Sequence, residues 1–364
     1  MKIFAALLTG ALIFMNCASG AEASRVITDE AGDKVTVPDK IERIAVAGIL
    51  PFPSVITVFL GSAEKLVGIP PASMGAAKAG LLGELFPEIL KAQTGYTAGL
   101  DLNIEELMKL RPDVVFYLAG NKEMGKMIKN AGLPAVAISP TKWNYDVLRT
   151  YDEWIKTLSQ IFPESAKSKE VSRYSKKVYA DIQKKVGKIK PADRKKALFL
   201  FQYDDKRMVT SGRSFFGQYW CDAVGARNAA EEVPADNSNA VITMEQVYKW
   251  NPDVIFITNF TPALPEDLYG NKIGGHDWSA VKAVKERAVY KMPLGTYRSY
   301  TPGVDTPVTL MWMAQKVYPE LLKEVDMRKE VRNYYKKLYG ITLSDRQIEQ
   351  MYNQGRGSAA GFIK

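Results

Sequence analysis

The sequence contains a single histidine and only two cysteines among its 364 residues. One histidine excludes metal sites that are built on two, such as the HExxH arrangement of zinc proteases. The two cysteines, Cys17 and Cys221, are too few for a disulfide framework and do not form a CxxC redox motif. A GxSxG nucleophile elbow is also absent from the sequence. The chain therefore lacks the common signatures of metalloproteases, thiol oxidoreductases and serine hydrolases.

Apolar runs of membrane-spanning length are lacking as well. The longest apolar stretch, residues 4–15, is too short to cross a bilayer but is typical of a signal-peptide core. Small residues follow this stretch and predict cleavage after Gly20 or after Ala23. We therefore expect a signal peptide over 1–23 and a periplasmic mature protein. A lipid on Cys17 is the less favoured alternative, because the small residue that usually precedes a lipidated cysteine is missing.

Compact basic clusters are missing too, although the formal net charge is +9. The lysines are spread along helical patterns such as residues 174–185, as on a solvated helix face. Nucleic-acid binding would need basic residues gathered together with aromatic ones. We therefore expect no nucleic-acid partner, and the charge gives a weak preference for anionic ligands.

The most informative feature that is present is an internal repeat. Residues 103–117 read NIEELMKLRPDVVFY, and residues 243–257 read TMEQVYKWNPDVIFI, so that Glu105 and Glu245 occupy the same position in the two copies. Each copy predicts a short helix, a Pro-Asp turn and a buried strand. A unit that returns half a chain later indicates two similar lobes, and small ligands usually bind in the cleft between lobes.

Strand and helix patterns alternate along both halves, with predicted strands at 43–47, 65–69, 135–138 and 197–201. This alternation predicts an α/β fold of two lobes, each a doubly wound, mostly parallel sheet that is flanked by helices.

A helical pattern without internal glycine or proline follows the first lobe. We therefore expect a first lobe over 24–143, a single bridging helix over 144–163, and a second lobe over 164–364. The Gly/Ser/Ala-rich tail from about residue 354 is predicted to be flexible. One stiff bridge between lobes predicts that closure of the cleft is small.

Several segments together resemble the periplasmic solute-binding proteins of ABC importers, in the class that carries iron-siderophores, haem or cobalamin. They are the predicted hairpin over 26–37, the two repeats, the segments VTSGRSFFG (209–217) and AVGARN (223–228), and the late segment 278–290. The resemblance covers nearly all of the mature chain. It implies a monomer without enzymatic activity or cofactor that delivers its ligand to a permease dimer in the inner membrane.

In such proteins each lobe carries an exposed glutamate that docks onto arginines of the permease, and the matching residues are Glu105 and Glu245. One carboxylate on each lobe suits a two-fold permease dimer, because arginine binds carboxylate with two parallel hydrogen bonds. The structural alternative is that both are solvated acids in the first turn of a helix, where negative charge is favourable.

Ligands of doubly wound sheets lie beyond the carboxyl ends of the strands. Side chains near these ends are the candidate ligand contacts: Arg298, Tyr297, Tyr300, Tyr203, Arg213, Tyr117, Asn259 and Ser238, with Tyr96 and Trp143 as aromatic walls. Arg298 is the strongest candidate, because a guanidinium offers fixed charge and a planar fork to a carboxylate, a phosphate or another oxyanion. Tyrosines are also often half-buried for packing alone.

Metal ligation by the protein itself is a weaker expectation. A phenolate of Tyr297 or Tyr300 could bind ferric iron, and the resemblance implies a late tyrosine in that role. His276 could be a metal ligand oriented by Asp277, but a place on the surface before Trp278 is the simpler interpretation. The histidine that some siderophore binders carry before the second repeat is absent here, which argues against a His–Tyr iron site.

The predicted function is capture of a metal chelate, foremost a ferric siderophore or a related iron complex, for an ABC importer. Haem, cobalamin or a molybdate-like oxyanion are alternative ligands. A secreted hydrolase that uses His276 and Asp277 with a distant serine is a remote alternative, and turnover of ester substrates would reveal it. A surface adhesion or sensor module is a third class, which would have no permease gene beside its own.

Overall fold

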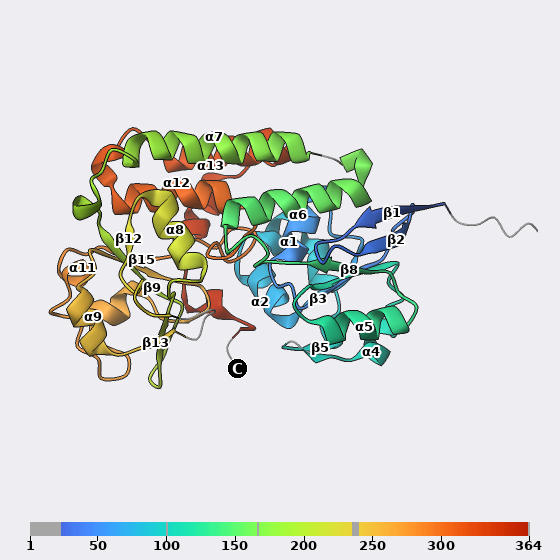
Figure 1. Cartoon of the computed structure of the whole chain (residues 1–364), viewed down its shortest axis with the longest axis horizontal. Helices are drawn as coiled ribbons and strands as arrows, with labels where there is room; N and C mark the ends of the chain where they lie inside the picture. The colour runs from blue at the N-terminus through green and yellow to red at the C-terminus, as the bar shows by residue number, and fades with distance from the viewer. Residues whose placement is uncertain (1–22, 100, 166, 235–239, 363–364) are drawn as a thin grey trace, which may run out of the picture.

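The computed structural model describes residues 23–99, 101–165, 167–234 and 240–362 (Figure 1). Residues 1–22 of the predicted signal peptide, with Cys17, and the candidate ligand residue Ser238 lie outside the described residues. Within them, no helix combines the length and the apolar character that crossing a membrane requires.

The described part of the chain opens with the predicted hairpin, formed by β1 (Ser24–Thr28) and β2 (Lys34–Pro38). The Asp29 carboxylate shapes its turn by accepting hydrogen bonds from the main-chain nitrogens of Ala31 (3.0 Å) and Asp33 (2.9 Å). Its second oxygen accepts from the nitrogen of Ala137 (3.0 Å), so the same side chain fixes the hairpin to the edge of the first sheet.

The first lobe is built on a parallel sheet with the strand order β4-β3-β7-β8. Its strands are β3 (Ile44–Ala47), β4 (Leu66–Gly68), β7 (Val114–Leu118) and β8 (Ala135–Ile138). Alternate residues of β3 enter two different apolar clusters, one under α1 and one under α4 and α5. The sheet is therefore covered on both faces, which explains its continuously apolar strands. The helices are α1 (Phe52–Leu60), α2 (Pro71–Ala79), α3 (Leu82–Leu85), α4 (Ile104–Lys109) and α5 (Lys122–Asn130).

The second lobe repeats this plan with the parallel order β12-β9-β14-β15. Its strands are β9 (Lys196–Leu200), β12 (Arg227–Asn228), β14 (Val254–Ile257) and β15 (Val289–Lys291). A small antiparallel sheet adjoins them: β10 (Gln202–Tyr203), β11 (Met208–Thr210) and β13 (Ala240–Ile242). The helices are α8 (Phe216–Val224), α9 (Met244–Trp250), α10 (Pro265–Tyr269) and α11 (Lys282–Lys285). Together the two lobes confirm the predicted fold class.

The two repeats are equivalent in structure as well as in sequence. Asp113 accepts a hydrogen bond from the main-chain nitrogen of Arg43 (2.8 Å), just before β3, and Asp253 accepts one from Lys196 (2.7 Å), at the start of β9. Each aspartate thus ties its own strand to the neighbouring parallel strand. Arg111 and Asn251, which precede the prolines, share the same left-handed φ of 44°.

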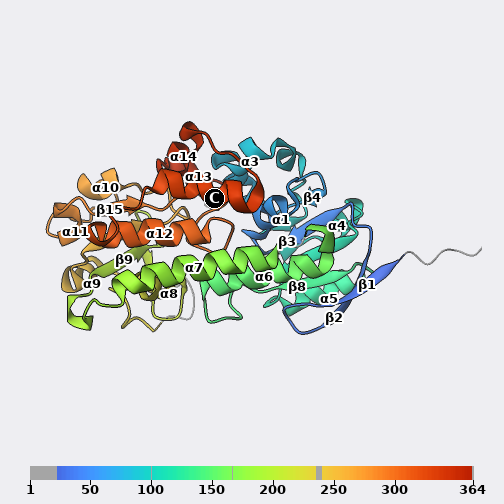
Figure 2. The same cartoon turned by 90° about the horizontal axis from the view of Figure 1, so that it is seen from above.

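Long helices join the lobes along one side of the molecule (Figures 1 and 2). They are α6 (Val147–Ile161), α7 (Ser168–Val186) and α12 (Thr306–Val317), and they are followed by α13 (Met327–Tyr339) and the shorter α14 (Asp345–Tyr352). Short elements complete the fold: β5 (Thr97–Ala98), β6 (Asp101–Leu102), η1 (Pro87–Lys91), η2 (Pro163–Ser165), η3 (Pro191–Asp193), η4 (Pro319–Leu321) and η5 (Arg356–Ala359).

The connection between the lobes is a pair of helices rather than the single predicted bridge. Helix α6 begins only at Val147, because Asn144 and Tyr145 have positive φ and Asp146 caps the helix by accepting from the nitrogen of Arg149 (2.8 Å). Both α6 and α7 bury residues in the cores of both lobes. We expect this double connection to resist bending more than one helix would.

The last helices return to the first lobe. Val331 and Tyr335 of α13 and Ile348 of α14 are buried in the apolar cluster that contains β3 and α1. The predicted boundaries place these helices in the second lobe, 164–364, whereas their packing belongs to the first. The final segment then lies between the lobes (Figure 1).

Candidate functional site

The strongest predicted ligand residue, Arg298, lies where the two lobes meet. It follows β15, and its side chain is only 1% exposed. The guanidinium makes five hydrogen bonds within the protein. They go to the main-chain oxygens of Asn259 (2.9 Å), Ser358 (3.0 Å), Ala72 (3.0 Å) and Ala360 (2.7 Å) and to the hydroxyl of Tyr297 (3.3 Å). Arg298 therefore links α2 of the first lobe, the second lobe and the C-terminal segment.

Three residues next to Arg298, in the sequence or through a main-chain hydrogen bond, carry buried polar atoms without a partner. Among the described residues, the buried Oδ1 of Asn259, Oγ of Ser299 and Oγ of Ser358 have no hydrogen-bond partner. Buried polar atoms normally find a partner, so each of these is able to bind a ligand group or water. The Nδ2 of Asn259 is held by the oxygens of Met292 (2.9 Å) and Pro293 (2.9 Å), which fixes the direction of its amide.

An aromatic wall lies beside Arg298 and consists of Phe201, Phe215, Phe260 and Tyr300. The ring centroid of Phe201 is 5.1 Å from that of Phe260 and 5.6 Å from those of Phe215 and Tyr300. The Arg298 guanidinium lies 5.4 Å from the Phe260 ring centroid, so charge and aromatic surface adjoin. Sequence reasoning missed Phe201 and Phe260. Both stand at the carboxyl end of a central strand, but no phenylalanine was among the candidates chosen at such positions.

The two predicted docking glutamates are exposed and lie in the first turns of α4 and α9. Both helices lie on the lower side of the molecule in Figure 1, at opposite ends, whereas α7 and α13 run along the upper side. A hydrogen bond from the Thr243 hydroxyl lowers the pKa of Glu245, so this carboxylate is charged at neutral pH. One carboxylate per lobe is thus available on the same side of the protein.

The family model described as periplasmic binding protein matches residues 51–294, most of the chain. The chain belongs to this family. A solved periplasmic solute-binding protein from Veillonella parvula is 30% identical, with a TM-score of 0.81 over 91% of this chain and 97% of its own. Molybdate-binding protein MolA of Haemophilus influenzae is 26% identical over 360 residues, which cover 90% of this chain and 95% of MolA. The Fe(3+)-citrate-binding protein YfmC of Bacillus subtilis is 24% identical over 333 residues, which cover 87% of this chain and 97% of YfmC.

The family membership confirms the resemblance that was drawn from the sequence. It also accounts for the repeat, since each lobe of the binding protein is one α/β unit with its own copy. The relatives are named for what they bind, which agrees with the missing catalytic motifs.

Two late tyrosines of the binding protein, on either side of Arg298 in the sequence, are buried. Tyr297 is 3% exposed, and its hydroxyl accepts a hydrogen bond from Arg298. Tyr300 is fully buried, and its hydroxyl accepts from the nitrogen of Gly217 (3.1 Å). Burial raises the pKa of both phenols, which disfavours the phenolate that ferric iron would require. Among the described residues there is also no cluster of three histidine, cysteine or acidic side chains that could hold a metal.

Tyr203 and His276 come together away from Arg298. The Tyr203 hydroxyl donates to the oxygen of Ile273 (3.1 Å), lies 3.0 Å from Nδ1 of His276 and accepts from Nε1 of Trp278 (3.0 Å). With Tyr203 1% exposed, this network fixes the loop before α11 to the core of the second lobe. The Nδ1 of His276 is thus engaged within the protein by the Tyr203 hydroxyl.

Four further candidates make their contacts with residues other than Arg298. Tyr96 and Tyr117 are buried in the apolar cluster under α4 and α5, where the Tyr96 hydroxyl donates to the oxygen of Val46. Arg213 is exposed, and its Nε donates to the oxygen of Glu231 (3.0 Å). Trp143 is half-buried, with the ammonium of Lys142 5.7 Å from its ring centroid.

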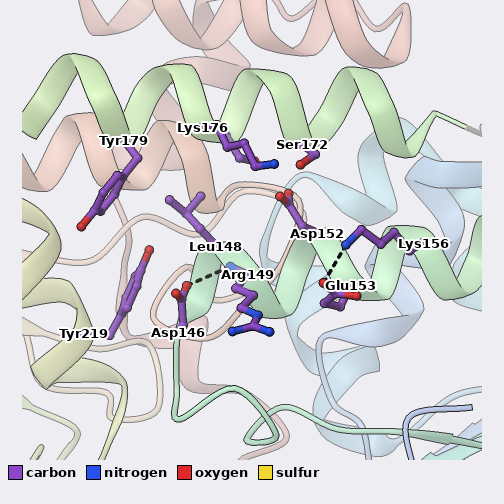
Figure 3. A pocket seen from close by; sticks show the side chains of 11 residues that line it. Asp146, Leu148, Arg149, Asp152, Glu153, Lys156, Ser172, Lys176, Tyr179 and Tyr219 are labelled. Carbon is purple, nitrogen blue, oxygen red and sulfur yellow. Dashed lines mark hydrogen bonds and ion pairs between the residues drawn. The ribbon is translucent and has the colours of Figure 1, made fainter.

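A separate polar cavity of about 460 Å³ lies between α6, α7 and α8 (Figure 3). Acidic and basic side chains alternate along it, as with Glu153, which accepts from Nζ of Lys156 (2.7 Å). Burial raises the pKa of Asp146 and Asp152 in its wall. Acidic and basic side chains are equal in number in the lining of this cavity, whereas the junction at Arg298 presents a single buried positive charge.

Proposed function

We propose that this binding protein captures a metal chelate, foremost a ferric siderophore or a related iron complex, for an ABC importer. Support comes from the family and from an iron-citrate binder among the relatives. The observation that carries the proposal is the buried guanidinium of Arg298 between the lobes, with the aromatic wall beside it. This pairing suits an anion that also carries aromatic or planar apolar groups. The chelate is cargo, and the protein needs no cofactor of its own.

A molybdate-like oxyanion is the second candidate, favoured by the similarity to MolA and by the same guanidinium. Haem and cobalamin are further alternatives within the proposal. Native mass spectrometry and metal analysis of the protein from its own host test the ligand class directly. Iron together with an organic mass is the expected result, whereas molybdenum without an organic mass would favour the second candidate. Titrations in which the protein binds none of ferric citrate, haemin and molybdate would contradict the proposal.

We also propose that Glu105 and Glu245 dock a monomer of the binding protein onto a permease dimer. Their exposure, their equivalent positions in the repeats and their place on one side of the molecule support this role. Export to the periplasm after cleavage of residues 1–23 follows from the sequence and is consistent with the family; lipid attachment at Cys17 remains the alternative.

A further inference from the structure

The C-terminal segment, residues 356–362, is packed rather than flexible as its composition predicts. Ser358 is 2% exposed and Ala359 is 4% exposed. At its start, the two terminal nitrogens of Arg356 donate to the two carboxylate oxygens of Asp267, both at 2.7 Å. Asp267 is itself buried, so this pair fixes the segment to the second lobe more firmly than a surface ion pair would.

The same segment packs on α2 of the first lobe without room to spare. A Cβ added to Gly75 would lie 2.1 Å from the oxygen of Ala360, and one added to Gly361 would lie 2.7 Å from the oxygen of Pro71. Gly361 also has a left-handed φ of 76°, which favours glycine. The close main-chain contact between the segment and α2 requires glycine at these two positions.

The groups that this segment contacts are those of the proposed ligand site. The oxygens of Ser358 (3.0 Å) and Ala360 (2.7 Å) accept hydrogen bonds from Arg298. The ring of Phe362 lies 4.7 Å from Phe260 between centroids, in an edge-to-face contact on the aromatic wall. Partial negative charge thus meets the guanidinium while an aromatic ring meets the wall.

We propose that residues 356–362 are an internal occupant of the ligand site, which an incoming cargo must displace. The inference rests on the proposed function and sharpens its ligand class. The two carbonyl oxygens mark where the carboxylate or phenolate oxygens of the cargo bind, and the Phe362 ring marks where its aromatic or porphyrin-like part binds. A small inorganic oxyanion would replace the carbonyls but would leave the aromatic wall unused.

Displacement has a measurable consequence for affinity. When the segment is docked for a fraction of the time, the apparent Kd rises in inverse proportion to the fraction that is free. A segment that is docked nine-tenths of the time therefore weakens cargo binding about tenfold. Loosening the segment should therefore strengthen cargo binding. If the segment instead supported the bound cargo as a wall of the site, loosening it would weaken binding.

Docking can be tested without any ligand in the full chain. Gly75→Ala adds the methyl group that collides with Ala360, and Phe362→Ala removes the ring from the wall. Gly95→Ala is the matched control, because a Cβ at Gly95 meets nothing within 4 Å. Trypsin removal of residues 357–364 after Arg356, followed by intact mass, should be at least fivefold faster in both variants than in the wild type and the control. Equal rates in all four proteins would overturn the docking.

Competition is tested by titrating the same four proteins with haemin and with molybdate. Haemin should bind about tenfold more tightly to Gly75→Ala and Phe362→Ala, and it should accelerate trypsin removal in the wild type. Haemin affinity that is equal or weaker in these variants would overturn competition while leaving the proposed function intact. Faster trypsin cleavage in the variants with no binding of either probe to any protein would uphold the docking but count against the proposed function.

Discussion

Glu30, in the turn of the N-terminal hairpin, connects three parts of the first lobe. Its carboxylate accepts hydrogen bonds from the nitrogen of Ser139 (2.6 Å), after β8, and from the hydroxyl of Thr157 (3.3 Å) on α6. Its main-chain oxygen accepts from Nζ of Lys142 (2.7 Å). The residue therefore holds the loop that leads from the sheet to α6, and its charge state should matter to stability.

Burial outweighs these hydrogen bonds and raises the pKa of the Glu30 carboxyl from 4.5 to about 8. Between these pH values the folded protein holds a proton that the unfolded chain has lost. The contribution of Glu30 to stability is thus fully present below pH 4.5 and is lost as the pH rises to 8. At about 1.4 kcal/mol per pKa unit, the loss across the window is on the order of 4–5 kcal/mol.

The perturbation is Glu30→Gln, which keeps the shape of the side chain and stays neutral at every pH. Denaturant unfolding at pH 5, 6, 7 and 8 measures the free energy of unfolding of both proteins. Relative to the variant, the wild type should lose several kcal/mol of this free energy between pH 5 and pH 8. Glu123→Gln, at an exposed acid on α5, is the control that should follow the wild-type profile. A wild-type curve parallel to that of Glu30→Gln would refute the reasoning.

Three further predictions address permease docking, the ligand site, and the loop over 258–263 that Lys291 holds. The double variant Glu105→Ala with Glu245→Ala should abolish cellular uptake of the cargo without changing its affinity for the purified protein; uptake at the wild-type rate would contradict permease docking. Arg298→Met should weaken binding of an anionic cargo in calorimetric titration and should lower the free energy of unfolding by about 3–5 kcal/mol, because buried carbonyl oxygens lose a charged donor. Lys291→Met should lower the free energy of unfolding by about 2–4 kcal/mol in denaturant unfolding, since the buried amino group donates to the oxygens of Thr258, Thr261 and Ala263. A loss below about 1 kcal/mol would argue against a role of Lys291 in holding this loop.

The fold could be predicted from the sequence because its determinants are local and repeated. The same unit, a Pro-Asp turn followed by an apolar strand, occurs twice, at Asp113 and at Asp253. Parallel sheets with both faces covered need such apolar strands. The path of the last helices could not be predicted in this way. Nothing in the apolar pattern of α13 says that Tyr335 packs in the first lobe rather than in the second, because either core accepts an amphipathic helix.

The candidate site could be predicted only in part, for a related reason. The rule of strand ends correctly placed Arg298, Tyr297 and Asn259 near one another, since all three follow strands of one parallel sheet. It could not say that the donors of Arg298 face main-chain oxygens of the C-terminal segment, because a carbonyl oxygen is the same in every residue. The glycines at 75 and 361 carry that information, but only once the two main chains are known to meet.

The placement of the connecting helices bears on how cargo is released. Helices α6, α7 and α12 contribute to the cores of both lobes, and α7 runs along the upper side in Figure 1, whereas α4 and α9, which carry Glu105 and Glu245, lie on the lower side. If the proposed docking holds, a permease that binds Glu105 and Glu245 acts on the lobes at a distance from the connecting helices, which resist bending. Without cargo, α2 is held by the hydrogen bond from Arg298 to Ala72 and by the close contact of Gly75 with the C-terminal segment. In the proposed docking, separation of the lobes by a permease requires that the hydrogen bond from Arg298 to Ala72 breaks.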